Sequence, residues 1–255
     1  MERRRVLVTG ASRGIGRAVA LAFAERGDRV AVHCAANRDD AEETVRLLPG
    51  DGHAVIVGDL GDPRVAERVV DDAVRALVGV DVLVNNAAVA PTAANRHDVA
   101  DVTYADWQAV WRRMVDVNLL GAANLTYGVA RHLIDCGATG SVVNVGSRGA
   151  FRGEPDFPAY GATKAALHAF GQSMAVSLAP HGIAVTSVAP GFIATERQQD
   201  KLAGAGGADL RAQSPFGRVG TPREIAAAVV YLASPEAAWS SGTVLDLNGA
   251  SYLRT

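Results

Sequence analysis

The stretch that decides the fold is Thr9-Gly-Ala-Ser-Arg-Gly-Ile-Gly16, which follows the apolar run Val6–Val8 and precedes a pattern typical of a helix. Glycines at a strand-to-helix turn let the backbone approach the phosphates of a dinucleotide, which favour the amino terminus of the helix. Tight turns elsewhere also need glycine, so the turn alone leaves a structural role open. The residues of this turn that we expect to bind a dinucleotide are Gly10, Ser12, Arg13, Gly14, Ile15 and Gly16.

Short β-branched runs alternate along the chain with longer segments in which apolar residues recur three and four apart. The runs predict strands and the longer segments predict helices. Apolar strands separated by helices require crossover connections, which give a parallel sheet covered on both faces. The predicted fold is therefore a Rossmann-like, doubly wound α/β domain with a parallel seven-stranded sheet. Strands are expected at 6–8, 30–32, 54–57, 80–84, 141–145, 183–188 and 243–247, and helices at 14–26, 39–48, 63–78, 104–135, 159–179 and 222–233.

Composition favours one soluble domain spanning residues 1–255. The formal charge of -2 gives no reason to expect a nucleic acid or a membrane as partner. The first apolar run breaks at Thr9 and Gly10, too soon for a signal peptide or a membrane span, so a cytoplasmic location is expected. The two cysteines lack CxxC spacing and the six histidines lack paired metal spacing, so no metal is expected. Residues 195–216 are rich in Gly, Ala, Gln and charge and are expected to form a mobile loop.

Four polar residues in separate segments are candidates for catalysis. Tyr160 and Lys164 are four apart, which places phenol and ammonium on one helical face. Ser147 follows the run 141–145, at the carboxyl edge where open α/β sheets bind ligands. Asn118 lies in an apolar helical run, where asparagine is a poor helix former. Taken singly, each also has a structural explanation: a chance helical pair, a turn serine or a buried amide.

Together these segments resemble the short-chain dehydrogenase/reductase family over residues 6 to about 249. The glycine turn has the family's GxxxGxG spacing, and Asn118, Ser147, Tyr160 and Lys164 are similar to its catalytic tetrad. The resemblance implies hydride transfer between a nicotinamide and a carbonyl or secondary alcohol. Hydride addition leaves negative charge on oxygen, which calls for a proton donor. Tyr160 is the expected acid, with its pKa lowered by Lys164, while Ser147 holds the substrate oxygen and Asn118 a relay water.

Further cofactor contacts follow from the same resemblance. Asp59 and Leu60 end the third predicted strand, where the carboxylate would accept from the adenine amino group; an acidic helix cap before Pro63 is the alternative from the residues alone. The motif Asn85-Asn-Ala-Ala88 is similar to the family's NNAG, with alanine in place of the glycine. The remaining residues implied to contact the cofactor are Asn86, Ala87, Tyr160, Lys164, Pro190, Gly191, Ile193 and Thr195.

The end of the second predicted strand favours NADP(H) over NAD(H). A carboxylate there would bond the ribose 2'-hydroxyl and repel a 2'-phosphate, but His33-Cys-Ala-Ala-Asn-Arg38 contains no acid. Arg13 and Arg38, with Asn37 beside the latter, are in position to reach a 2'-phosphate. Solvated surface arginines are the alternative.

The substrate is the least determined part of the prediction. Residues 191–216 and the loop 148–159 should border it, but Arg148 and Arg152 are opposed there by Glu154 and Asp156. Overall the chain resembles bacterial 3-oxoacyl-[acyl-carrier-protein] reductases, which implies an NADP(H)-dependent ketoreductase of a carrier-linked or small ketone, with a 3-oxoacyl thioester as the expected class, in a homotetramer or a dimer. The alternatives are an NAD-dependent alcohol, sugar or steroid dehydrogenase, and a non-catalytic protein that senses dinucleotides.

Overall fold

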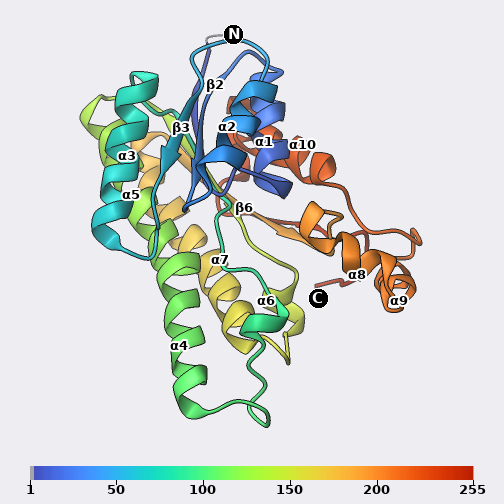
Figure 1. Ribbon diagram of the computed structural model, residues 1–255. Helices are drawn as coiled ribbons and strands as arrows, with labels where there is room; N and C mark the ends of the chain where they lie inside the picture. The colour runs from blue at the N-terminus through green and yellow to red at the C-terminus, as the bar shows by residue number, and fades with distance from the viewer. Residues whose placement is uncertain (1–2, 255) are drawn as a thin grey trace.

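A computed structural model of the protein describes residues 3–254 and centres on one parallel sheet (Figure 1). The strand order is β3-β2-β1-β4-β5-β6-β7, and every neighbouring pair runs parallel. The expected strands and the doubly wound fold are confirmed, with strand ends within two residues of the predicted positions. The strands are β1 (Arg5–Val8), β2 (Arg29–Cys34), β3 (Ala54–Val57), β4 (Val82–Asn85), β5 (Gly140–Val145), β6 (Ile183–Pro190) and β7 (Val244–Leu247).

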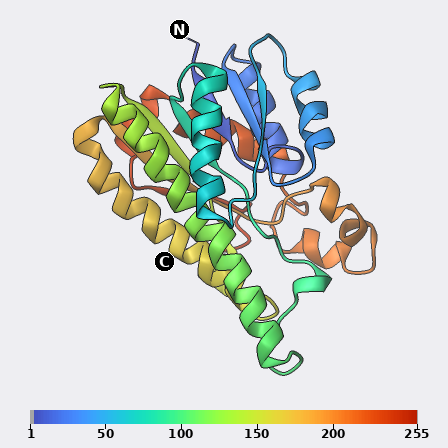
Figure 2. The same cartoon turned by 60° about the vertical axis from the view of Figure 1, so that its left-hand side comes forward.

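Helices cover both faces of the sheet, as Figure 2 shows. On one face α1 (Gly14–Ala24), α2 (Arg38–Leu47) and α10 (Pro222–Leu232) pack apolar side chains against the strands. On the other face α3 (Pro63–Leu77), α5 (Ala122–Asp135) and α7 (Pro158–Leu178) do the same. The two hydrophobic cores that result are why most strand residues are apolar, as expected for a sheet buried on both sides.

Helix ends follow the polar signals in the sequence. Thr221 accepts a hydrogen bond from the Glu224 N–H, and the Glu224 carboxylate accepts one from the Thr221 N–H. Pro222 occupies the first helical position of α10, where its missing N–H costs nothing. Thr103 caps α4 (Tyr104–Val115) in a similar way, since its side chain accepts from the Asp106 N–H. The local sequence therefore fixes where these two helices begin.

Two segments differ from the sequence-based expectation. The helix predicted over 104–135 is interrupted by a π-helical turn, η2 (Asp116–Gly121), between α4 and α5. The segment 195–216, predicted to be a mobile loop, contains the short helices η4 (Glu196–Gln198), α8 (Gln199–Ala203) and α9 (Gly207–Ala212), so it is not loop throughout, and its mobility stays a prediction. The remaining short helices are η1 (Ala93–Asn95), α6 (Gly149–Arg152), η3 (Ala179–His181) and η5 (Pro235–Ser240).

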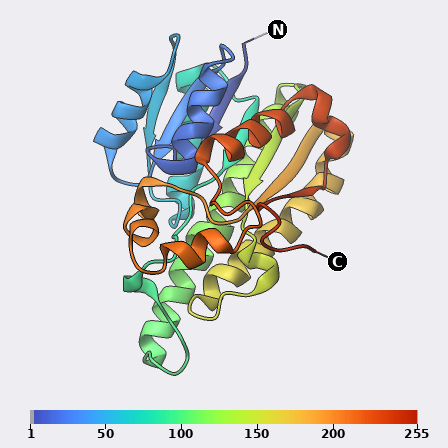
Figure 3. The same cartoon turned by 90° about the vertical axis from the view of Figure 1, so that its right-hand side faces the viewer.

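The strand order places a crevice at the carboxyl ends of the strands. The chain builds β2 and β3 on one side of β1 and β4 to β7 on the other, so the connections after β1 and β4 leave in opposite directions. Figure 3 shows α8 and α9 (orange) on the same side of the molecule as these strand ends. Among residues 3–254, no helix combines the length and the apolar character needed to cross a membrane.

Candidate active site

A cleft of about 580 Å³ lies at the carboxyl ends of the strands. It extends from the glycine turn after β1 to Tyr160 and Lys164 on α7. The structure thus brings together most of the residues selected from sequence. Those that line the cleft are Gly10, Ser12, Arg13, Gly14, Ile15, Gly16, Asp59, Leu60, Asn86, Ala87, Ser147, Tyr160, Lys164, Pro190, Gly191, Ile193 and Thr195. Those that do not are Asn37, Arg38 and Asn118.

The glycine turn has the shape needed for a dinucleotide. Gly10 and Gly14 adopt left-handed φ values of 61° and 58°, which favour glycine. A Cβ at Gly16 would lie 2.3 Å from the Gly10 carbonyl oxygen, so no side chain fits there. The Asn86 amide donates to the carbonyls of Thr9 and Gly10 at 2.8 and 3.1 Å, which ties the end of β4 to the turn. The residues present therefore fit a dinucleotide whose phosphates lie at the start of α1.

His33 supports the turn from below and was not selected from sequence. The Gly10 N–H donates to His33 Nδ1 at 3.3 Å, and Nε2 lies 2.9 Å from the Gly58 carbonyl oxygen, where its N–H donates. Burial lowers the pKa of His33 to about 4, so the ring is neutral and has the tautomer that both bonds require. The signal was available, because a histidine replaces an apolar residue near the end of an otherwise apolar strand.

Tyr160, Ser147 and Lys164 converge at the opposite end of the cleft. Lys164 is 2% exposed, and its Nζ donates to the Val145 carbonyl at 2.7 Å. Burial lowers the pKa of Lys164 from 10.5 to about 8. Burial raises the pKa of Tyr160, partly offset by a hydrogen bond with the Ser147 side chain. The expectation that Lys164 lowers the phenol pKa is therefore not met, because Lys164 Nζ bonds to a backbone carbonyl and lies 5.9 Å from the centre of the tyrosine ring.

Asn118 explains the π-helical turn but does not reach the cleft. Its Oδ1 accepts from the Val89 N–H at 2.7 Å, and its Nδ2 donates to Thr163 Oγ1 at 3.2 Å and to the Val89 carbonyl at 3.4 Å. Asn118 is 1% exposed, so these bonds satisfy the amide inside the protein. Asn118 thus holds the loop after β4 against α7, since it bonds to Val89 in that loop and to Thr163, the residue before Lys164.

The expected adenosine contacts fall into two groups. Asp59 lines the cleft and is engaged by Arg113, which forms an ion pair with it at 3.0 Å. Burial raises the pKa of Asp59, but the bonds from Arg113 and the Gly61 N–H outweigh it, so the pKa is lowered overall. Asn37 instead caps α2, and Arg38 pairs with Glu42 at 3.4 Å outside the cleft lining.

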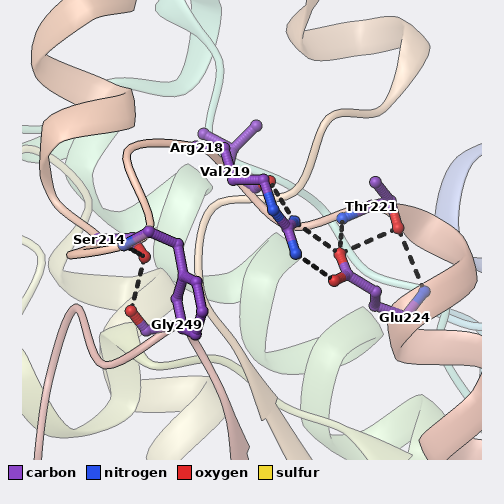
Figure 4. A network of polar contacts seen from close by, with 7 residues as sticks. Ser214, Arg218, Val219, Thr221, Glu224 and Gly249 are labelled. Carbon is purple, nitrogen blue, oxygen red and sulfur yellow. Dashed lines mark hydrogen bonds and ion pairs between the residues drawn. The ribbon is translucent and has the colours of Figure 1, made fainter.

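The substrate side of the cleft is bordered by α6, by the segment that contains α8 and α9, and by the chain after β7. Arg148 is 6% exposed and donates to Gln213 Oε1 at 2.7 Å and to Ser251 Oγ. The segment ends in a fixed polar network (Figure 4). In it Ser214 Oγ donates to the Gly249 carbonyl at 2.6 Å, and Arg218 donates to both carboxylate oxygens of Glu224 at 2.6 and 3.0 Å. The carboxyl end of this segment is therefore anchored to α10 and the chain end.

Comparisons with known proteins agree with this geometry. The family model described as enoyl-(acyl carrier protein) reductase matches residues 10–249. The chain is 37% identical to an L-rhamnose 1-dehydrogenase (NAD(P)(+)) from Sphingomonas sp. strain SKA58, an alignment that covers 99% of this chain and 98% of the relative. It is 36% identical to a 3-oxoacyl-[acyl-carrier-protein] reductase from Vibrio cholerae, with 99% of each chain covered.

Among solved structures, a short-chain dehydrogenase from Burkholderia cenocepacia J2315 in complex with NADP superposes with a TM-score of 0.85 at 30% identity, covering 97% of each chain. An acetoin dehydrogenase from Enterobacter cloacae gives the same TM-score and identity, with 98% of this chain and 96% of that one covered. These relatives share the fold over almost the whole length of the chain. The protein therefore belongs to the short-chain dehydrogenase/reductase family and is an oxidoreductase that uses a nicotinamide dinucleotide.

Proposed function

We propose that the protein is an NADP(H)-dependent ketoreductase that interconverts a carbonyl compound and a secondary alcohol. The observation that carries this proposal is the joining of two sites in one cleft. At one end of the cleft the glycine turn leaves no space for a side chain at Gly16. At the other end Tyr160 forms a hydrogen bond with Ser147, and Lys164 is buried nearby. Such an arrangement of a dinucleotide turn and a polar acid site supports hydride transfer to a carbonyl.

The bound nicotinamide would supply or accept the hydride. Ser147 is placed to hold the substrate oxygen, since its Oγ accepts from the Gly149 N–H at 3.0 Å and its hydroxyl group bonds to Tyr160. Burial raises the pKa of Tyr160, which keeps the phenol protonated and able to donate to an oxygen that gains negative charge. Lys164 would contact the nicotinamide ribose and return a proton to Tyr160, a role that its pKa of about 8 favours near neutral pH.

Arg13 supports the preference for NADP(H). It is exposed at the glycine turn and lines the cleft, and its guanidinium has no hydrogen bond or ion pair with any residue in 3–254. The end of β2 supplies Cys34 and Ala35 to the cleft and no carboxylate. We expect Arg13→Gln to raise the Kd for NADPH ~10- to 100-fold while changing that for NADH little.

The matched control for that substitution is Arg38→Gln. The Arg38 guanidinium pairs with Glu42 away from the cleft, so its loss should leave both affinities nearly unchanged. Both Kd values can be measured by fluorescence titration. An equal loss of NADH and NADPH affinity in Arg13→Gln would contradict the assignment of the 2'-phosphate to this residue.

For the substrate we propose a 3-oxoacyl thioester or a related small ketone. The similarity to the 3-oxoacyl-[acyl-carrier-protein] reductase supports this class. A second candidate, a sugar, is favoured by the L-rhamnose 1-dehydrogenase relative and by the polar groups that line the cleft together with Tyr160, including Glu154, Gln198 and Gln213. Steady-state rates with a 3-oxoacyl thioester, free ketones and aldoses, each with both cofactors, separate these candidates.

Tyr160→Phe tests the proposed chemistry. Removing the hydroxyl should lower kcat ~100- to 10,000-fold on every substrate turned over, because the proton donor is lost. Binding of NADPH, followed by fluorescence, should change little. Retained turnover would contradict Tyr160 as the acid. A wild-type protein that binds NADPH and reduces no ketone or sugar would favour the alternative of a dinucleotide sensor.

We also propose a homotetramer in the cytoplasm. Large side chains are exposed on helices of the sheet's second face and on η5: Tyr127 is 69%, Val176 79% and Trp239 101% exposed. Exposed apolar groups of this size favour burial between subunits. The free thiols Cys34 and Cys136 suit a reducing compartment. Light scattering on the purified protein measures the subunit number.

A further inference from the structure

The cleft contains an arginine that the proposed reaction does not use. Arg197, in η4 directly after Thr195 and Glu196, lines the cleft together with Tyr160 and Ser147. Within residues 3–254 its guanidinium has no hydrogen-bond or ion-pair partner. The neighbouring arginines differ, since Arg148 bonds to Gln213 and Arg152 lies 3.7 Å from the Glu154 carboxylate. An unpaired guanidinium in a cleft is suited to bind an anion.

Glu196 and Arg197 are adjacent in sequence, carry opposite charges and both line the cleft. The Glu196 carboxylate accepts from the Gly14 N–H at 3.1 Å, so it lies on the glycine turn. Burial raises the pKa of Tyr160; among the smaller effects Glu154 adds to this rise and the Arg197 charge opposes it. Partial burial and the nearby positive charge of Arg13 lower the pKa of Arg197, although the side chain is still exposed on the cleft.

We propose, on the basis of the function proposed above, that Arg197 determines specificity by binding a carboxylate of the substrate close to the carbonyl that Tyr160 protonates. Among the substrates proposed above, this selects a small oxo acid, or the corresponding hydroxy acid, over a 3-oxoacyl thioester or another neutral ketone. Planar guanidinium and carboxylate groups pair through two parallel hydrogen bonds, which would fix the orientation of the substrate as well as its position.

The same charge is less suited to a phosphate of the cofactor. Phosphates at the glycine turn already have the Arg13 guanidinium, which has no partner among residues 3–254. The Glu196 carboxylate, next to Arg197 in sequence, lies against that turn and adds negative charge there. Arg197 lines the same cleft as Tyr160 and Ser147, so a substrate held by these two residues shares the cleft with the guanidinium.

The test compares each acid with its neutral ester. Pyruvate, acetoacetate and levulinate, which differ in the distance from carbonyl to carboxylate, are assayed with NADPH against their methyl esters. Wild-type protein should give a higher kcat/KM with at least one acid than with its ester. Arg197→Gln should lower this acid-to-ester ratio ~10- to 100-fold, the range for a charged hydrogen-bonded pair. Arg197→Lys, which keeps the charge without the planar fork, should retain part of the ratio.

Lys201→Gln is the matched control, because Lys201 is an exposed cation of the same cleft lining. It should change the ratio less than about fivefold. Wild-type protein that prefers every ester would overturn the proposal while leaving the ketoreductase function intact. A parallel loss of acid and ester turnover in Arg197→Gln, together with a weaker Kd for NADPH, would assign Arg197 to the cofactor and also overturn it. Failure to reduce any acid, ester or neutral ketone would refute the proposed function itself.

Discussion

The buried ammonium of Lys164 should make the protein less stable than it would be with an apolar side chain at this position. Lys164 is 2% exposed, and burial lowers its pKa from 10.5 to about 8. This difference corresponds to about 3 kcal/mol of destabilisation at a pH well below 8. Lys164→Met removes that cost but leaves the Val145 carbonyl without its donor, at a cost of about 1–3 kcal/mol. The variant should therefore be more stable at pH 7 by up to about 2 kcal/mol.

The pH dependence gives the sharper prediction. Because the pKa of Lys164 is lower in the folded protein, the unfolded chain keeps the proton between pH 8 and 10.5 while the folded protein releases it. The destabilisation caused by Lys164 is therefore absent above pH 10.5, its pKa in the unfolded chain, and it develops as the pH falls toward 8. Between pH 7 and 9.5 the wild-type protein should gain about 2 kcal/mol from Lys164, and Lys164→Met should lack this gain.

Urea unfolding followed by circular dichroism at the two pH values measures the difference. Lys201→Met is the control, since Lys201 is exposed and its loss should leave the pH dependence as in the wild type. Turnover of Lys164→Met should fall even as its stability at pH 7 rises. If the free energies of unfolding of the wild type and Lys164→Met change in parallel with pH, the ammonium is not desolvated as described.

Two further predictions follow from the same contacts. Gly16→Ala places a Cβ 2.3 Å from the Gly10 carbonyl oxygen and should weaken NADPH binding more than tenfold by fluorescence titration, whereas Gly206→Ala, with open space around it, should not. Burial lowers the pKa of His168 to about 4, so the free energy of unfolding should fall as the pH drops from 6.5 toward 4. His168→Leu should reduce that loss by up to about 3 kcal/mol, as measured by urea unfolding across this pH range. The same pH dependence in the variant and the wild type would contradict a buried neutral ring.

The fold was predictable because its signals are local and repeated. Each strand is a short apolar run and most helices show apolar spacing of three and four, so strand ends were placed within two residues. The caps at Thr103 and Thr221 were visible for the same reason. The parallel order then follows from the crossover helices.

The features that sequence missed depend on tertiary contacts. The π-helical turn at Asn118 forms where its amide bonds to Val89 and Thr163, which lie 29 and 45 residues away. The glycines of residues 195–216 favoured a mobile loop, so α8 and α9 were not predicted. The end of this segment is held by the hydrogen bonds of Ser214 and Arg218, whose partners are distant or in another helix.

Charges at the site were the hardest to foresee. Arg113, on α4, reaches Asp59 over 54 residues and engages the carboxylate that was expected to bind adenine. Arg38 looked available for a phosphate, yet it pairs with Glu42 one helical turn away. Sequence identifies the charged groups of a cleft, but their partners depend on where the helices lie.

The central claim is that the Tyr160 hydroxyl faces the reacting carbonyl beside a bound nicotinamide. A crystal structure with NADP and a substrate or product that the enzyme turns over tests it most directly. The account predicts that Tyr160 Oη and Ser147 Oγ both lie within hydrogen-bonding distance of the substrate oxygen, with Lys164 Nζ on the ribose. A turnover-competent complex in which the phenol points away from that oxygen would contradict it.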